Sequence, residues 1–191
     1  FRADIFIIKL DPNGTRLWAS YYGGSVWDGA IGAFSVMADV EVDYNDNMIV
    51  TGNTASADFP TGAAAGQTRW SSAIVFSNDA FIIKFDPNGN RLWATFYGGN
   101  SMDDATAVDV DMTNNILITG YTNSSNFPVS ATAYQQSFNL GVAVAGARDA
   151  FVLKFDPTGI RLWASYLGGS GAEFWANAGI VDVASDSQNN I

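Results

Sequence analysis

The sequence predicts an all-β fold, namely a β-propeller made of four-stranded antiparallel blades of about 70 residues each. Three observations predict this fold: a long segment recurs along the chain, each period contains four short strand-like runs, and these runs are apolar on both faces. The 191 residues provide about two and a half such blades, which is an incomplete segment of a ring.

A 21-residue segment occurs three times. It reads DIFIIKLDPNGTRLWASYYGG at 4–24, DAFIIKFDPNGNRLWATFYGG at 79–99 and DAFVLKFDPTGIRLWASYLGG at 149–169. The first two copies are identical at 16 of 21 positions, and the last two at 14. A second unit at 39–60 recurs at 109–128, and a third copy of it begins at Val181 and reaches Ile191. The chain is therefore a repeat protein, with periods of 75 and 70 residues between Trp18, Trp93 and Trp163.

Four strands are expected in the first complete period, at 36–43, 48–54, 79–86 and 91–97. β-Branched and aromatic residues dominate these runs, and turn residues bound them. The third and fourth strands are joined by Asp-Pro-x-Gly turns, in which proline presets φ and glycine accepts positive φ. These turns lie at 11–14, 86–89 and 156–159.

The strands are apolar on both faces, which favours a propeller over a sandwich. In the first strand Ile5 and Ile7 share one face, while Phe6 and Ile8 share the other. Both faces are buried when each small sheet stacks between two others, whereas a half-exposed strand alternates apolar with polar residues. A β-solenoid is the rival fold, but its repeats are usually shorter.

We divide the chain into a partial blade at 1–35, blades at 36–105 and 106–179, and the start of another blade at 180–191. Two complete blades cannot close a ring, and open ends leave strand edges and apolar faces uncovered. We therefore expect further blades of the same chain, or other protein chains, to complete the structure. The chain does not begin with Met, and we expect it to be mature, processed or partial.

Composition argues against several functions. The formal net charge of −10 argues against nucleic acid and anionic lipid as partners, and no apolar run is long enough for a membrane helix. Histidine is absent, which removes the commonest general base and metal ligand, and cysteine is absent too. We expect no enzymatic activity.

The repeat resembles the bacterial SBBP β-propeller repeat family. The motifs that carry the resemblance are Asp-Ala-Phe-x-x-Lys-Phe-Asp-Pro-x-Gly, Tyr-x-Gly-Gly, Asp-x-x-x-Asn-Ile and Thr-Gly-x-Thr-x-Ser-x-x-Phe-Pro. They stand here at 79–89, 111–116 and 119–128, and at 97–99, where this copy reads Tyr-Gly-Gly. The resemblance implies a secreted or outer-surface bacterial protein, and it supplies no catalytic residues.

Cations and tryptophans recur at fixed positions of the repeat. All three lysines share one position, and half of the arginines share another. We expect each lysine to form a partly buried ion pair with a neighbouring aspartate, either Asp11, Asp86 or Asp156 or the aspartate that opens the strand. A ligand-binding ring of lysines is the alternative. These structural repeat positions are Lys9, Lys84, Lys154, Arg16, Arg91, Arg161, Trp18, Trp93 and Trp163.

Oxygen-rich loops at 43–47, 111–115 and 186–190 present ligand atoms at alternating positions, which is one feature of calcium loops. Hairpin turns stabilised by Asp and Asn side chains explain them equally well, and we expect no cofactor. Asp103, Asp104 and Glu173 are the carboxylates considered for glycoside hydrolysis, but no nucleophile–base pair accompanies them.

Two insertions, at 61–78 and 129–148, lengthen the blades after a Phe-Pro step. Inserted loops commonly carry specificity, and their aromatic residues could bind a protein or stack on a sugar. The candidate contact residues are Trp70, Tyr134 and Phe138. The other reading, which also covers Trp27 and Trp175, is that these rings pack the loops onto the blade edges.

The expected function is that of a noncatalytic scaffold of a secreted or cell-surface protein, used for protein–protein contact or adhesion. The alternative is a carbohydrate-binding module that works beside polysaccharide-processing enzymes. The expected partners are other protein chains or further blades, or a glycan, with no nucleic acid and no membrane insertion.

Overall fold

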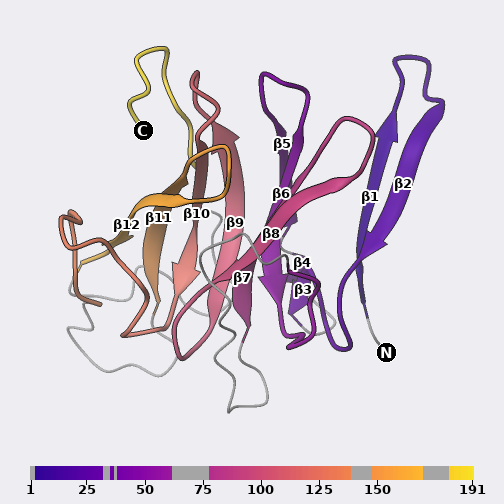
Figure 1. The fold of residues 1–191 in the computed structure, drawn as a ribbon. Helices are drawn as coiled ribbons and strands as arrows, with labels where there is room; N and C mark the ends of the chain where they lie inside the picture. Colours follow the sequence, from indigo (N-terminus) through magenta and orange to yellow (C-terminus); the bar gives the residue numbers. More distant parts are fainter. Residues whose placement is uncertain (1–2, 32–34, 37, 62–77, 139–147, 170–180) are drawn as a thin grey trace.

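The computed structural model describes residues 3–31, 35–36, 38–61, 78–138, 148–169 and 181–191, and within these ranges it contains strands and turns but no helix. Two four-stranded antiparallel sheets form its centre, and in each of them consecutive strands are neighbours (Figure 1). Blade A consists of β5 (Ala38–Val42), β6 (Met48–Thr54), β7 (Asp79–Phe85) and β8 (Arg91–Tyr97). Blade B consists of β9 (Asp103–Val110), β10 (Ile116–Thr122), β11 (Asp149–Phe155) and β12 (Arg161–Leu167).

The strands predicted for the first complete period are confirmed to within two residues at each end. The expected division between residues 105 and 106 falls inside β9, because the pairing of β9 with β10 already starts at Asp103. The connection between the two blades is therefore the short segment 98–102.

Before blade A stands a two-stranded hairpin, β1 (Ile5–Leu10) and β2 (Arg16–Tyr22), which we call half-blade N. By sequence its strands correspond to the third and fourth strands of blades A and B. After blade B, residues 181–191 lie beside β9, where the Thr106 hydroxyl donates to the Val181 carbonyl at 2.8 Å. We call these residues the C-terminal segment.

A short hairpin, β3 (Ala30–Ile31) and β4 (Ser35–Val36), was not expected from the sequence. It interrupts the first strand of blade A, which we call its inner strand. Asp28 bridges Thr54 in the same way that Asp103 pairs with Thr122 in blade B. The inner strand of blade A therefore begins at Asp28, leaves the sheet through the hairpin and returns at Ala38.

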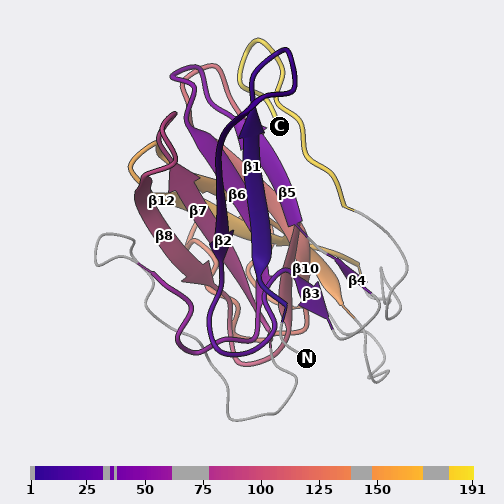
Figure 2. The same ribbon diagram turned by 90° about the vertical axis from the view of Figure 1, so that its right-hand side faces the viewer.

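The sheets stack face to face, and the core lies between them (Figures 1 and 2). One hydrophobic cluster joins blade A to blade B, with Ile82 and Tyr97 against Phe151 and Leu153, and a second cluster joins half-blade N to blade A. The central strands of blade A, β6 and β7, are buried on both faces, as the sequence pattern predicts, whereas Val40 and Val42 of β5 are 52% and 49% exposed.

Half-blade N differs from this pattern, because only one of its faces is buried. Ile5 and Ile7 point into the core, whereas Phe6 is 57% exposed and Tyr21 is 74% exposed. The described part of the chain contains no sheet on that side, so the stack of blades is open there.

Candidate interaction surface

The same residues make the contact between successive sheets at both places where the structure describes one. Between half-blade N and blade A, the indole Nε1 of Trp18 donates to the carbonyl of Pro87 at 3.1 Å. Between blades A and B, Nε1 of Trp93 donates to the carbonyl of Pro157 at 3.2 Å. We call this contact, an indole of one blade over the Pro-x-Gly turn of the next, the tryptophan joint.

A glycine makes room for each indole. Gly89 has a φ of +84° and Gly159 a φ of +90°, a left-handed conformation that glycine adopts without strain. A Cβ on either glycine would lie 2.9 Å from the ring of Trp18 or Trp93. The glycine of the turn therefore serves both the backbone conformation and the close approach of the next blade.

An arginine clamp forms a second contact between sheets. Nη1 of Arg91 donates to the Tyr22 hydroxyl at 2.6 Å and to the Pro60 carbonyl at 2.6 Å. The Tyr22 hydroxyl itself donates to the Pro60 carbonyl. Guanidinium hydrogen bonds are charge-assisted, so this clamp ties the outer strands of neighbouring blades together.

The clamp recurs between blades A and B. Nη1 of Arg161 donates to the Tyr97 hydroxyl at 2.6 Å and to the Pro128 carbonyl at 2.7 Å. Burial raises the pKa of Tyr97 to about 12, although Arg161 opposes this shift. Leu167 occupies the position of Tyr22 and Tyr97 in β12, so that strand presents no hydroxyl to a following arginine.

Two of the three lysines form ion pairs, but with aspartates other than those expected from the sequence. Nζ of Lys84 lies 2.8 Å from Asp43, and Nζ of Lys154 lies 2.7 Å from Asp111. Both aspartates belong to the turn between the first and second strands of the same blade. Burial disfavours ionisation of Asp111, but the hydrogen bonds from Lys154, Asn115 and Thr113 together outweigh it and keep the pKa of Asp111 below its ordinary value.

The aspartates expected as partners instead stabilise their own turns. Oδ1 of Asp86 accepts backbone N–H bonds from Asn88 and Asn90 at 2.9 and 2.8 Å, and Asp11 and Asp156 act in the same way. This prediction was wrong because the two kinds of aspartate look alike in sequence, and only the strand register places one beside the lysine. Lys9 donates to the Pro87 carbonyl at 3.4 Å.

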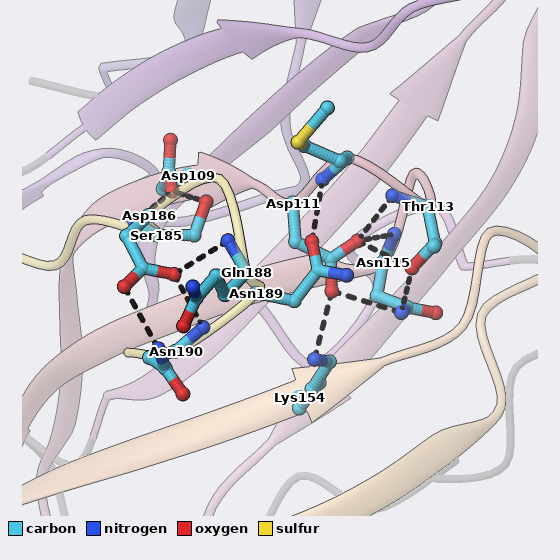
Figure 3. Close-up of polar contacts among 11 residues, drawn as sticks. Asp109, Asp111, Thr113, Asn115, Lys154, Ser185, Asp186, Gln188, Asn189 and Asn190 are labelled. Atoms are coloured by element: carbon cyan, nitrogen blue, oxygen red, sulfur yellow. Dashed lines mark hydrogen bonds and ion pairs between the residues drawn. The ribbon is translucent and has the colours of Figure 1, made fainter.

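The three oxygen-rich loops are side-chain-stabilised turns. Oδ1 of Asp111 accepts backbone N–H bonds from Thr113 and Asn115 at 2.8 and 3.0 Å, and Oδ2 accepts from the Asn115 amide (Figure 3). The turns at Asp43 and Asp186 repeat this pattern. Among the described residues no group of three or more carboxylate, histidine or cysteine side chains is arranged to hold a metal ion.

A third contact between blades comes from residues that the sequence analysis did not single out. Asn114 and Asn189 have positive φ values of 62°, and their side-chain oxygens point toward the preceding blade. Oδ1 of Asn114 accepts the N–H of Tyr44 at 2.8 Å. In the same way Oδ1 of Asn189 accepts the N–H of Met112 at 3.1 Å (Figure 3). Asn114 and Asn189 occupy the same position of the repeat, and this recurrence was the signal in the sequence that could have identified them.

Asp103 anchors the connection from blade A to blade B. Its carboxylate accepts hydrogen bonds from the N–H of Gly99 at 2.7 Å, the Thr122 hydroxyl at 2.5 Å and the Ser124 hydroxyl at 2.8 Å. Asp28 is held by the corresponding residues at the start of blade A. Because no cation offsets its burial, the pKa of Asp103 is raised to about 7.

Asp104 has no such counterpart in blade A. It forms a buried ion pair with Arg148 at 3.0 Å and accepts a hydrogen bond from the Asn53 amide at 2.8 Å. The adjacent carboxylates considered for hydrolysis are thus each engaged by their own structural partners. Glu173, the third candidate, lies outside the described residues.

The start of the second insertion runs along the outer edge of β12. The N–H of Ser130 donates to the Ala164 carbonyl at 3.0 Å, and the N–H of Tyr166 donates to the Gln135 carbonyl at 3.2 Å. Gln135 also accepts the N–H of Gly168 through its side chain at 2.8 Å. We call residues 129–138 the edge segment, because they cover an edge that would otherwise be open to pairing.

The aromatic candidates differ in their placement. Phe138 packs against the hydrophobic cluster that joins blades A and B, with its ring centroid 5.9 Å from that of Tyr166. Tyr134, in contrast, is 89% exposed. Trp27 is half-buried beside half-blade N, where Ala3 bridges it. Trp70 and Trp175 lie outside the described residues. Tyr134 on the edge segment is therefore the candidate that the structure leaves accessible.

Comparison with known proteins agrees with this architecture. The model of the SBBP β-propeller repeat family matches residues 92–128, which contain parts or all of β8, β9 and β10. The chain is also 28% identical over 176 residues to an uncharacterized WD repeat-containing protein of Acanthamoeba polyphaga mimivirus. The alignment covers 84% of this chain but 12% of that relative. The chain is therefore built from β-propeller blades, and its residues 92–128 match the SBBP β-propeller repeat.

Proposed function

We propose that the chain is part of a noncatalytic propeller scaffold that binds another protein through the edge segment. The repeated cations of blades A and B support this, because Lys84, Lys154, Arg91 and Arg161 all make contacts within or between the blades. The observation that carries the proposal is the 89% exposure of Tyr134 on a segment held in place by hydrogen bonds to β12. An exposed aromatic ring on a rigid support is a common anchor in protein interfaces.

The test compares proteins captured by the wild-type chain with those captured by Tyr134→Ala. A control, Tyr44→Ala, removes a tyrosine that is also exposed but lies in the turn between β5 and β6. The proposal expects a partner that is lost with Tyr134→Ala, retained with Tyr44→Ala, and bound by the purified wild-type chain in calorimetry. Identical partner sets for the wild type and Tyr134→Ala would refute it.

A carbohydrate-binding module is the second candidate, and the exposed ring of Tyr134 favours it too, because aromatic faces stack on sugars. The amide side chains of Gln135 and Gln136 lie beside it in the sequence. A glycan array distinguishes the two functions. Binding of a defined oligosaccharide that is lost with Tyr134→Ala or Trp70→Ala supports the module, and no binding on the array argues against it.

We also propose that the protein acts outside the cell or on a bacterial cell surface, as the SBBP resemblance implies. Within the described ranges there is no helix of the length and apolarity needed to cross a membrane. The net charge of −10 supports a partner other than nucleic acid. Fractionation of the source cells, with the protein followed by an antibody, tests the location.

A further inference from the structure

The turns of the blades lie together at one end of the stack, which is the upper end in Figure 1. In blade A, Met48 pairs with both Val42 and Phe85, so the turn between β5 and β6 lies beside the turn between β7 and β8. Blade B repeats this arrangement. We call the first turn of each blade its inner turn and the second its outer turn. The surface that they form, the turn face, consists of residues 43–47, 86–90, 111–115 and 156–160.

Polar contacts fix the turns of the turn face relative to one another. The N–H of Tyr44 donates to Oδ1 of Asn114 at 2.8 Å, which joins the inner turn of blade A to that of blade B. Below the face, the buried ammonium of Lys84 donates to the Pro157 carbonyl in the outer turn of blade B at 3.2 Å. The turn face is therefore a rigid support for the side chains that it exposes.

The residues that form the turns recur, whereas the exposed residues of the turn face vary between copies. Tyr44, Met112 and Ile160 are 68%, 57% and 60% exposed. The same positions in other copies of the repeat are occupied by Ser187, Thr15 and Asn90. The apolar side chains are thus not needed to form the turns, and blades A and B carry three of them on one face.

Neighbouring blades do not cover these positions. The turn of Met112 has a described turn on either side, one in blade A and one at 186–190 in the C-terminal segment, and Met112 is still exposed. Asn90, at the position of Ile160, is exposed although blade A packs against a sheet on each side. A further blade stacks on the face of a sheet, so it would lengthen the row of turns and leave their tips accessible.

The turn face also carries uncompensated negative charge. Asp86 and Asp156 are partly exposed in the outer turns, and among the described residues no lysine or arginine forms an ion pair with either. The lysines of the same blades lie beneath the face, where the side chains of Lys84 and Lys154 are 3% and 12% exposed and pair with aspartates of the inner turns. The accessible charge of this face is therefore acidic.

We propose that the turn face binds a segment of a partner protein in which lysine or arginine residues flank apolar side chains. Tyr44, Met112 and Ile160 contact the apolar side chains, and Asp86 and Asp156 attract the flanking cations. Tyrosine and methionine are enriched in protein interfaces, and a rigid face loses little conformational entropy on binding. Charge complementarity selects a basic segment over an acidic one.

This inference adds a second binding surface to the scaffold and does not rest on the edge segment. Tyr44→Ala should lose binding of a basic segment and keep the partner that Tyr134 holds, and Tyr134→Ala should do the reverse. Failure of one proposal therefore leaves the other standing.

Calorimetric titration of the 191-residue chain tests the proposal with the peptide acetyl-Lys-Lys-Leu-Phe-Lys-Lys-amide. Met112→Ser should weaken binding at least about fivefold, because an apolar contact is lost. Asp156→Asn should weaken it by up to about fivefold, since the charge is lost while the amide oxygen still accepts the N–H bonds of the turn. A peptide with Ser-Ser in place of Leu-Phe should bind the wild type at least about fivefold more weakly and lose nothing further with Met112→Ser.

The matched control for charge is Asp4→Asn, which removes one exposed carboxylate beside the opposite end of β1. At an ionic strength of about 0.15 M, charges more than about 8 Å apart are largely screened, so this variant should bind like the wild type. Thermal unfolding checks that each variant is folded.

The proposal is overturned if the Leu-Phe peptide does not bind the wild type, or if it binds the wild type and Met112→Ser equally. It is also overturned if Asp4→Asn weakens binding as much as Asp156→Asn does, because the peptide would then respond only to the net charge of the chain.

Discussion

Replacing Gly159 by alanine puts a methyl group into the tryptophan joint between blades A and B. The new Cβ would lie 2.9 Å from the ring of Trp93, at a residue whose φ is +90°. A left-handed conformation costs an L-residue about 1–2 kcal/mol. Displacing the indole also weakens its hydrogen bond to Pro157, a bond of a kind that contributes about 0.5–1.5 kcal/mol. We therefore expect Gly159→Ala to lower the free energy of unfolding by about 1.5–3.5 kcal/mol.

Gly14→Ala is the matched control for this change. Gly14 has nearly the same backbone conformation, with a φ of +82°, but no described atom lies within 4 Å of its would-be Cβ. It should therefore show the backbone cost alone, about 1–2 kcal/mol. Urea denaturation of both variants, at concentrations where the chain is monomeric, measures the difference. Equal losses of stability in the two variants would show that the joint contributes nothing.

Three other substitutions test separate contacts. Asp103→Asn should remove a pH dependence of stability. The folded-state pKa of Asp103, about 7, lies above the unfolded value of 3.8, so the stability that its protonated form contributes is full below pH 3.8 and is lost as the pH rises through 7. Denaturation at several pH values measures this loss. Asp111→Ala leaves Lys154 buried without its carboxylate and should cost about 3–5 kcal/mol in urea denaturation, whereas the double variant with Lys154→Met should recover part of this loss. Tyr97→Phe removes the hydroxyl that accepts from Arg161 and should lower the melting temperature, whereas Tyr44→Phe, in an exposed turn, should leave it unchanged.

The strands and turns of the blades were predictable because their causes are local. Alternating β-branched and aromatic residues end at Asp-Pro-x-Gly turns, and proline and glycine fix these turns without help from distant residues. Because the segment with these strands and turns occurs three times, the same local pattern is seen in each copy. For this reason the strands of blade A matched the prediction to within two residues.

Contacts across the sheets were predictable only as to residue type. The lysines were expected to pair with aspartates, and two do, but the choice of Asp43 and Asp111 depends on the register that places each beside the third strand. Gly89 and Gly159 were predicted to be turn residues, but not to leave room for the indole of the preceding blade. That role exists only once the next blade is in place.

The β3–β4 hairpin was missed for a different reason. The chain has seven more residues between Asp28 and Asp43 than between Asp103 and Asp111, but the inserted residues are apolar like the strand that they interrupt. Composition therefore gave no boundary, and only the pairing of Asp28 with Thr54 reveals where the inner strand begins.

The equality of the two tryptophan joints has a consequence for how such chains change in length. Each joint needs only an indole on one side and a Pro-x-Gly turn on the other, and every period supplies both. Gain or loss of one whole period therefore leaves each remaining junction with complementary halves. The indole and the turn lie in the same hairpin, so gain or loss of that hairpin alone would leave a blade with the wrong number of strands. Recombination between copies of the repeat is thus tolerated in whole units, and blade number can drift without any new contact having to evolve.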